Sequence, residues 1–402
     1  MPDTTCCIVG GGPAGVMTGY LLARSGVRVV VLEKHKDFFR DFRGDTVHPS
    51  TLDVFYELGL LDGLLKIPHQ EMSTVGGRFS NYAFTAADFR HLPTHCRFIA
   101  LMPQWDLLNF LAEHAKQFPA FDLRMEHEAT GLLRDGGRIT GVEARTPSGT
   151  VRTTADLVIG CDGRHSVTRQ AAQMEVIEIG VPIDALWFRI SRKATDPEAS
   201  LGNINYGKAL ILINRSTYFQ AGLIIRKGSF DQLWQNGLAA FQQEIAGIAP
   251  FLNDRVPEVN DWEQVKLLSI QINRLKQWHR PGLLCIGDAA HAMSPAGGVG
   301  INLAIQDAVA TANLLTKPLL EGTVTEELLA RLQKRRELPA RVTQSVQAAA
   351  HKAMIAAIFD HPGPARAPLK LKLALKIPGI QRLLGRLVGM GILPEHVQTV
   401  PQ

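Results

Sequence analysis

A short glycine-rich loop near the N-terminus restricts the fold of this chain more than any other sequence feature. The loop, residues 10–15, follows the apolar run 6–9 and precedes residues 16–25, whose apolar side chains recur at helical spacing. Gly26 is a natural helix stop, and residues 27–32 form a second β-branched run. A strand, a helix and a strand within about 30 residues make a βαβ unit with parallel strands. The sequence therefore predicts an α/β fold.

The spacing of the glycines indicates a chemical role for the loop. In Gly10-x-Gly12-x-x-Gly15, the first glycine permits a tight turn, the second lets a diphosphate approach the backbone, and the third allows close helix packing. The helix N-terminus adds free N–H groups and a partial positive charge. Glu33 ends the second strand, where a carboxylate can accept hydrogen bonds from ribose hydroxyls. An ordinary βα turn with a solvated glutamate is the alternative. It is disfavoured because the loop follows a predicted strand, opens a helix and is followed by an acidic residue at the end of the second strand.

Two later motifs each follow an apolar run that is predicted as a strand. Asp162-Gly163-x-x-Ser166-x-x-Arg169 follows residues 155–160, and we expect its serine and arginine only to brace the turn. Gly287-Asp288 follows residues 282–286 and leads into the glycine-rich stretch 295–302, which opens a helix. An acidic residue at a strand end can hydrogen-bond a polyol, and the glycine stretch is a second anion site. Two such loops indicate one extended ligand with two ends.

The segments around these motifs predict a second sheet and a helical C-terminal part. Residues 181–273 contain short alternating runs without intervening helices, which favours an antiparallel sheet. Residues 72–98 show the same alternation more weakly. After Ile301 the sequence is predicted to be helical to its end, broken by prolines that include Pro339.

In their order and spacing, the three motifs resemble those of the class A flavoprotein monooxygenases, which share the para-hydroxybenzoate hydroxylase fold. The resemblance covers residues 4–60 and 97–345, and the substrate sheet in pattern only. It implies an enzyme with FAD as cofactor and NAD(P)H as co-substrate. Such an enzyme hydroxylates an aromatic or other electron-rich apolar substrate with O₂ through a C4a-hydroperoxyflavin.

The implied fold class is α/β, with an FAD-binding Rossmann-type parallel sheet, an inserted antiparallel substrate-binding sheet and a helical C-terminal region. The predicted regions are an FAD-binding domain (1–71, 98–180 and 275–345), a substrate-binding β-sheet domain (72–97 and 181–274) and a C-terminal helical region (346–402).

The resemblance also implies cofactor-binding residues. Those around the FAD diphosphate and adenosine are Gly10, Gly12, Ala14, Gly15, Glu33, Lys34 and Ala129. Those near the phosphate and ribityl chain are Arg43, Gln104 and Asp288. Those lining the isoalloxazine ring are Pro295, Gly297, Gly298, Gly300, Ile301 and Asn302, with the helix N-terminus directed at N1 and the C2 carbonyl.

Roles unrelated to the cofactor stay open for two of these residues, since Arg43 could form a surface ion pair and Gln104 could be a solvated helix terminus. We assign no catalytic residue, because the cofactor performs the difficult step. We expect His291 to cap local backbone, and we expect His48 to belong to the framework. No metal site is predicted.

The expected substrate pocket lies between the flavin and the second sheet. Its predicted walls are residues 98–102, 187–189, 210–213 and 218–220 together with Tyr206. These runs are aromatic and aliphatic, which favours an apolar aromatic or prenylated substrate, although Arg189 or Arg215 could bind an acid.

Three other functions compete with hydroxylation. A flavin-dependent reductase or dehydrogenase of the same fold would act without O₂. A halogenase also shares the fold, but the W-x-W-x-I-P signature of the tryptophan-type enzymes is absent from the sequence. A non-catalytic flavin-binding module at a membrane surface is the alternative from another class.

Charge is distributed unevenly along the chain. The net charge is +5, yet residues 331–402 hold 12 basic and 3 acidic residues. Residues 365–393 carry no acid and are rich in leucine; their basic residues are Arg366, Lys370, Lys372, Lys376, Arg382 and Arg386. Such a segment can lie on an anionic membrane, but we favour a lid packed on the core with its lysines in solvent. Nucleic-acid binding is disfavoured because no recognition motif accompanies the charge.

The compartment is predicted to be the cytoplasm, with peripheral membrane contact as an open possibility. The five cysteines are odd in number and form no C-x-x-C pair, which suits reduced thiols. The short polar stretch 1–5 is unlike a signal peptide. No apolar stretch reaches the ~18 residues of a membrane span. The oligomeric state is not predicted.

Overall fold

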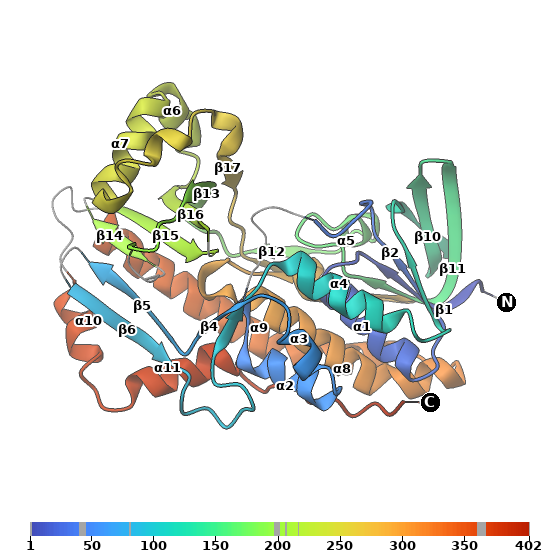
Figure 1. Ribbon diagram of the computed structural model, residues 1–402. Coiled ribbons are helices and arrows are strands. Elements are labelled where there is room, and N and C mark those ends of the chain that lie inside the picture. The colour runs from blue at the N-terminus through green and yellow to red at the C-terminus, as the bar shows by residue number, and fades with distance from the viewer. Residues whose placement is uncertain are drawn as a thin grey trace.

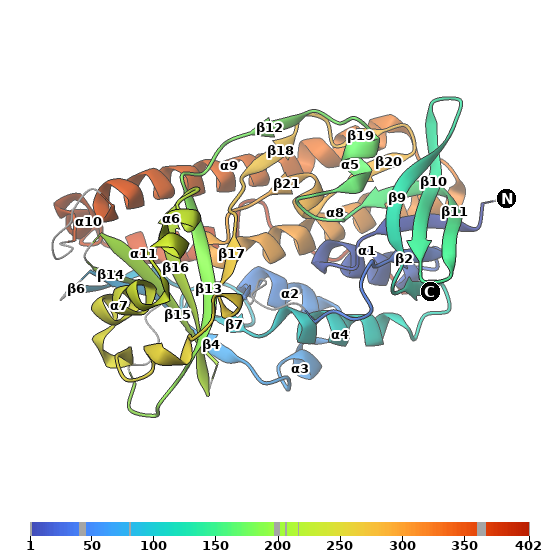
Figure 2. The ribbon, with the colours of Figure 1, turned by 90° about the horizontal axis from the view of Figure 1, so that it is seen from above.

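The computed structural model describes residues 2–39, 46–79, 82–196, 202–205, 207–215, 217–359 and 367–401. Two large sheets lie at opposite ends of the molecule, and the long helices α8 (Val299–Glu321) and α9 (Glu326–Ile358) run alongside them (Figures 1 and 2). The predicted cofactor motifs all belong to the first of these sheets and its helices.

The first sheet contains the predicted parallel core. Its order is β19-β20-β11-β1-β2-β8, and β9 and β10 extend β11 as an antiparallel ribbon. The strands are β1 (Thr4–Val9), β2 (Val29–Leu32), β8 (Phe121–Arg124), β9 (Glu128–Asp135), β10 (Arg138–Thr146), β11 (Gly149–Gly160), β19 (His279–Arg280) and β20 (Leu283–Cys285). β1 is parallel to both of its neighbours. Cys6 and Ile8 pack with α1 (Pro13–Arg24) and α8, and Cys7 and Val9 pack with the β9–β10 ribbon, so both faces of β1 are buried, which explains its continuous apolar sequence. Helix α1 packs between α8 and α4 (Gln104–Ala115).

The second sheet unites strands from two distant parts of the chain, as predicted. Its order is β17-β13-β16-β15-β14-β5-β6. The strands are β5 (Thr74–Phe79), β6 (Tyr82–Asp88), β13 (Ile183–Ser191), β14 (Asn203–Asn205), β15 (Lys208–Asn214), β16 (Tyr218–Arg226) and β17 (Lys266–Leu268). All its pairings are antiparallel except that of β14 with β5. The exact domain boundaries stay a prediction.

The expectation that this insertion lacks helices is wrong. Helices α6 (Phe230–Gln235) and α7 (Leu238–Ile248) follow β16, and Figure 1 shows them on the outer face of the sheet. Phe241, Ile245 and Ile248 of α7 recur at helical spacing and are buried against the sheet. Within the alternating region 181–273, residues 265–272 are predicted as one strand run, but they form a strand only over Lys266–Leu268.

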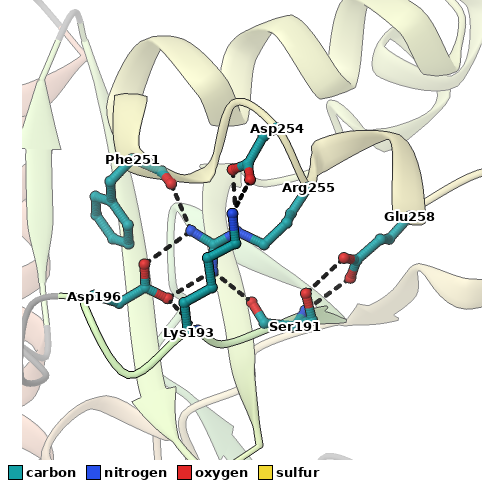
Figure 3. A network of polar contacts seen from close by, with 7 residues as sticks. All are labelled: Ser191, Lys193, Asp196, Phe251, Asp254, Arg255 and Glu258. Carbon is teal, nitrogen blue, oxygen red and sulfur yellow. Dashed lines mark hydrogen bonds and ion pairs between the residues drawn. The ribbon is translucent and has the colours of Figure 1, made fainter.

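A buried arginine fastens the chain after α7 to the end of β13 (Figure 3). Arg255 is 4% exposed, and its Nη1 donates to the Ser191 carbonyl (3.0 Å) and to Asp196 Oδ2 (2.6 Å). Its Nη2 donates to Asp196 Oδ1 at 2.9 Å and to the Phe251 carbonyl. Because the guanidinium and the carboxylate form a bidentate pair with further backbone acceptors, the helical layer is held in a defined position on the sheet.

The expectation of helix to the very end of the chain is also wrong. Pro339 lies inside α9 without ending it, and α10 (Leu369–Ala374) and α11 (Ile380–Gly389) follow. Residues 390–401 form no helix and run back to the first sheet, where Arg24 Nη1 donates to the Thr399 carbonyl at 3.1 Å. Glu57 accepts from the Val397 N–H at 2.7 Å. In the part of the chain that the structure describes, no helix is long and apolar enough to span a membrane.

Shorter elements lie between the strands of the two sheets and within the insertion. They are α2 (Pro49–Glu57), α3 (Leu61–Leu64), α5 (Val167–Ala171), β3 (Thr46–Val47), β4 (Gln70–Met72), β7 (Ile99–Leu101), β12 (Val176–Glu178), β18 (Asn273–Leu275), β21 (His291–Ala292), η1 (Pro250–Leu252), η2 (Val256–Glu258), η3 (Trp262–Gln264), η4 (Gly287–Ala289) and η5 (Ala296–Gly298).

Candidate functional site

The glycine loop between β1 and α1 combines two tight contacts with one open position. Gly10 has φ +103°, and a Cβ there would lie 2.5 Å from the Cys161 carbonyl oxygen. A Cβ on Gly15 would lie 1.9 Å from the Gly10 carbonyl oxygen. At Gly12, by contrast, no described atom lies within 4 Å of the Cβ position. The protein's own packing therefore requires Gly10 and Gly15, whereas the space at Gly12 can admit a ligand.

The N-terminus of α1 is electrostatically suited to an anion. Gly12 is the N-cap and Pro13 the first helical residue, and among the described residues no side chain caps this end. The first turn, which includes Ala14, carries no acid. Its N–H groups and the helix dipole therefore face the open space at Gly12, and no acid of the turn itself neutralises them.

Glu33 holds the loop to the end of β2. Its Oε2 accepts from the Gly11 N–H at 2.9 Å and its Oε1 from the His35 N–H at 3.0 Å. The side chain is buried. Lys34 is exposed. Ala129 in β9 is buried nearby, since the His127 N–H donates to the Glu33 carbonyl at 2.9 Å.

The turn η4 brings Asp288 to the same end of the sheet. A Cβ on Gly287 would lie 3.1 Å from the Ala14 Cβ, so the turn touches the start of α1. Asp288 is partly exposed, and its Oδ2 lies 3.3 Å from Nη2 of Arg164. Arg164 lies inside the second motif, after the end of β11. It occupies an unspecified position of that motif, and no local pattern links it to position 288, so it could not be predicted from the sequence.

The second motif has the bracing role that we expected. Asp162 Oδ1 accepts from the hydroxyls of Ser166 (2.6 Å) and Thr168 (2.8 Å), and Oδ2 accepts from the Thr168 N–H (3.0 Å). Ser166 caps α5 by accepting from the Arg169 N–H at 3.0 Å. The Arg169 guanidinium donates to the Arg164 carbonyl, which fixes the loop that carries Arg164.

The N-terminus of α8 is the second anion-type site. Pro295, Gly297 and Gly298 lie in and beside η5, and Gly300, Ile301 and Asn302 form the first turn of α8. That turn carries no acid, and no described side chain caps it. Gly298 has φ +64° and lies against Thr46, whose Oγ1 donates to the Gly298 carbonyl at 2.8 Å.

Asn302 is clamped by two hydroxyl groups that the sequence analysis missed. The Ser50 and Thr51 hydroxyls donate to its Oδ1 at 2.8 and 2.6 Å, and Asn302 is 3% exposed. Ser50 also contacts the Gly389 carbonyl at 3.1 Å. The amide orientation at the start of α8 is thereby coupled to α2 and to the C-terminal region.

His48 belongs to this framework, as expected. It is fully buried, and its Nδ1 lies 2.8 Å from the Val388 carbonyl. Burial lowers its pKa to about 4, against the opposing effect of neighbouring carbonyls, so the ring is neutral at pH 7.

The expectation that His291 caps local backbone is wrong. Its Nε2 lies 2.6 Å from Oδ2 of Asp307, and that oxygen also accepts from the Gly287 N–H at 3.0 Å. Burial alone would raise the pKa of Asp307, but His291 and Arg336 outweigh it and hold this pKa below its usual value. The acid therefore stays ionised inside the protein and fixes the turn that carries Asp288.

Two predicted residues remain, Arg43 and Gln104. Arg43 is outside the described residues. Gln104 is the half-buried first residue of α4, and its neighbour Trp105 packs on Phe39 with ring centroids 4.9 Å apart.

The predicted pocket walls divide between the two faces of the second sheet. Phe188, Leu210, Leu212 and Phe219 pack beneath α7, on the outer face. Trp187, Ile211 and Ile213 lie on the inner face together with Ile99 and Leu101 of β7. Tyr206 is outside the described residues. Only the inner group can face the cofactor motifs, because neighbouring strand residues point to opposite sides.

Comparison with known proteins identifies the family. A family described as "FAD binding domain" matches residues 3–348. A 6-methylpretetramide 4-monooxygenase from Streptomyces rimosus is 31% identical over 335 residues, covering 83% of this chain and 80% of that protein. A para-nitrophenol 4-monooxygenase from Pseudomonas sp. (strain WBC-3) is 23% identical, covering 80% of each.

A solved structure supports the fold. The anhydrotetracycline hydroxylase OxyS from Streptomyces rimosus matches with a TM-score of 0.76 at 21% sequence identity, covering 96% of this chain and 75% of that one. The family match spans most of the chain, and the Streptomyces relative exceeds 30% identity over most of its length. The chain therefore belongs to the FAD-binding family of class A flavin-dependent monooxygenases.

Proposed function

We propose that this enzyme hydroxylates an aromatic or other electron-rich apolar substrate, using O₂, NAD(P)H and the FAD of its family. The observation that carries the proposal is that the N-terminal parts of α1 and α8, neither capped by a described side chain, meet at the turn after β20. A Cβ on Gly287 in that turn would lie 3.1 Å from the Ala14 Cβ and 3.5 Å from the Ala304 Cβ. Relatives named for action on 6-methylpretetramide and para-nitrophenol support an aromatic substrate.

The residues present fit an FAD. The open position at Gly12 and the acid-free first turn of α1 suit a diphosphate, and the Glu33 carboxylate directly after β2 is the type of group that accepts hydrogen bonds from ribose hydroxyls. Asp288 is partly exposed beside Ala14, where a polyol chain can reach it. When bound, the flavin supplies electron transfer from NAD(P)H and the activation of O₂.

The chain's own residues then supply position and charge stabilisation. The N-terminus of α8 favours negative charge on a ring placed against it, by the half-charge of the helix dipole. Ser50 and Thr51 hold the Asn302 amide in one orientation, so this turn does not have to reorganise when a ligand binds. The neutral, buried His48 adds no opposing charge to the framework.

Contacts link the start of α8 to the inner face of the second sheet. Thr46 binds the Gly298 carbonyl and pairs in register with Leu101 of β7. Leu101 shares an apolar cluster with Trp187, which is 8% exposed. The Trp187 Nε1 has no hydrogen-bond partner among the described residues. A buried donor of this kind is costly unless a ligand satisfies it, which supports a substrate with a carbonyl or phenolic oxygen.

Recognition of a carboxylated substrate by Arg189 is a finer part of the proposal. Arg189 is exposed on β13, two residues from Trp187 on the same face, and its guanidinium lies 5.1 Å from the Tyr218 ring centroid. Replacing Arg189 with alanine should lower kcat/KM for carboxylated phenols more than for neutral phenols. An equal effect on both classes would refute acid binding by Arg189.

Oxygen consumption tests the proposed reaction. The purified protein should show a flavin spectrum, and a panel of phenols and polycyclic phenols should stimulate NAD(P)H oxidation with matching O₂ uptake and hydroxylated product. Hydrogen peroxide measured in the same assay separates uncoupled turnover from hydroxylation. Product formed without O₂ would instead support a reductase.

A dialkyldecalin synthase from Streptomyces rugosporus, 27% identical over 77% of this chain, favours a second candidate. Turnover that needs neither O₂ nor NAD(P)H would support such a synthase activity. A flavin that NAD(P)H cannot reduce would leave only a binding function.

We also propose a cytoplasmic location. All five cysteines are free and buried. Burial raises the pKa of Cys7 to about 12 and also raises the pKa of Cys285, so these thiols are protonated and unreactive at neutral pH. A reducing compartment suits such thiols. Fractionation of the native host, followed by immunoblotting, tests this location.

A further inference from the structure

Helices α10 and α11 lie at the far end of the molecule, along the edge strand β6 of the second sheet (Figure 1). Leu371 of α10 packs with Phe79 and Tyr82, and the Lys372 ammonium lies 4.8 Å from the Tyr82 ring centroid. α11 approaches β6 so closely that a Cβ on Gly385 would lie 2.1 Å from the Asp88 carbonyl oxygen. Both helices are therefore docked on the protein through defined contacts.

The side of α10 that faces away from the sheet is apolar. Leu369 is 71% exposed and Leu373 56% exposed, one helical turn apart. Ile377, three residues after the end of α10, is 56% exposed. A lid on the core would bury these side chains and expose its lysines, but here Lys372 covers Tyr82 while the leucines face solvent. α10 is packed on the protein through Leu371, as a lid would be, but Leu369 and Leu373 remain in solvent, so the lid interpretation stays a prediction.

The outward side of α11 adds positive charge around another exposed leucine. Leu383 is 62% exposed, and Arg382 and Arg386 on the same side are also exposed. Lys376, between the two helices, is exposed as well. The sequence from residue 361 to residue 394 contains no acidic residue. Exposed leucines that are accompanied along this segment by basic and no acidic residues match the headgroup region of an anionic bilayer, where apolar side chains insert and cations contact phosphates.

We propose that α10 and α11 bind peripherally to the surface of an anionic membrane. The membrane-contact face consists of Leu369, Leu373, Lys376, Ile377, Arg382, Leu383 and Arg386. The apolar members enter the interface, and the basic members contact lipid phosphates. The binding does not depend on the proposed reaction, because none of these residues belongs to the candidate cofactor site.

Vesicle co-sedimentation of the full-length flavin-loaded protein tests the proposal. Vesicles of phosphatidylcholine with 30% phosphatidylglycerol, a composition chosen for the assay, are compared with pure phosphatidylcholine at low and high salt. The protein should bind the anionic vesicles, and high salt should weaken the binding. Each basic residue near such a surface contributes about fivefold in affinity, so K376Q/R382Q/R386Q should bind ~100-fold more weakly.

A second experiment removes the apolar side chains of the membrane-contact face. The variant Leu369→Ser/Leu373→Ser/Ile377→Ser should lose binding to anionic vesicles. The matched control is Leu320→Ser/Leu338→Ser, which replaces exposed leucines of α8 and α9 that are 47% and 51% exposed. The control should bind like the unmodified protein, and all variants should retain their flavin absorbance, which shows that they are folded.

Three results would overturn the proposal. The first is absence of binding to anionic vesicles, and the second is binding that the serine variant retains. The third is a stable dimer, detected by analytical ultracentrifugation, that the serine variant dissociates, since the face would then join two copies of the chain. Failure to find hydroxylation would leave all three measurements interpretable, so the two proposals can fail separately.

Discussion

The Arg336 Nε donates to Oδ1 of Asp307 over 2.9 Å, and neither residue is more than 1% exposed. Asp307 lies in α8, which begins at the candidate flavin site, and Arg336 lies in α9. Arg336 also approaches Oε1 of Glu395 at 3.5 Å, in the segment that follows α11. The pair therefore connects the cofactor-side helix with the C-terminal third of the molecule.

Breaking this pair should destabilise the protein strongly. Arg336→Met leaves a buried carboxylate without its cation, which typically costs about 3–5 kcal/mol of unfolding free energy. The matched control is Arg335→Met, because Arg335 also binds Glu395 but its side chain is 42% exposed. Arg335→Met should lower the free energy of unfolding by less than about 1 kcal/mol. Urea unfolding of both variants measures the difference, and equal losses would contradict the special role of the buried pair.

Two substitutions in the glycine loop should have different effects, one on FAD binding and the other on the stability of the apoprotein. In Gly12→Ala the methyl group enters open space, so the apoprotein should keep its melting temperature, while FAD affinity should fall at least tenfold because the methyl occupies the proposed diphosphate space. In Gly15→Ala the methyl meets the Gly10 carbonyl, so the apoprotein itself should be destabilised. Thermal unfolding without FAD and flavin fluorescence titration measure the two quantities. Unchanged FAD affinity in Gly12→Ala would place the cofactor elsewhere.

His48 should make the protein less stable in mild acid. Its pKa of about 4 in the folded state lies below the ordinary value of 6.5, so the unfolded chain binds more protons between these pH values. This residue's contribution to stability should therefore fall by about 2 kcal/mol from pH 7 to pH 5, at 1.36 kcal/mol per pKa unit. His48→Asn should lack this part of the slope. Because burial also lowers the pKa of His279 and His351, only the difference between variant and unmodified protein is informative.

Trp187 should affect substrate preference through its free donor. Trp187→Phe should lower kcat/KM about tenfold for substrates with a correctly placed carbonyl or phenolic oxygen, equivalent to about 1.4 kcal/mol. Analogues without that oxygen should be affected less. Trp278→Phe is the control, because this fully buried tryptophan also has an unpartnered Nε1 among the described residues but packs in the first sheet's core. If Trp187→Phe lowers kcat/KM equally for both substrate classes, Trp187 contributes packing and not a hydrogen bond to the substrate.

The cofactor end of the fold is encoded locally and could be predicted from the sequence. Gly10, Gly12, Gly15 and Glu33 lie within one βαβ unit, where residue spacing alone determines which groups meet. Alternation likewise predicted the second sheet, but not which face of β13 is covered by α7 and which by β7. Trp187 and Phe188 are neighbours with similar chemistry, and only the elements packed against each face distinguish a substrate-side residue from a core residue.

The remaining relationships exist only in the tertiary structure. Thr51 and Asn302 are 251 positions apart, and Asp307 and Arg336 meet across two helices, so no local pattern signals either contact. The sequence by itself determined that the C-terminal region is basic and amphipathic. Which side of α10 faces the protein was decided by the fit of Leu371 and Lys372 against the edge of the second sheet. Short-range spacing specifies turns and periodicity, whereas the burial of each face depends on the surfaces that chain folding brings together.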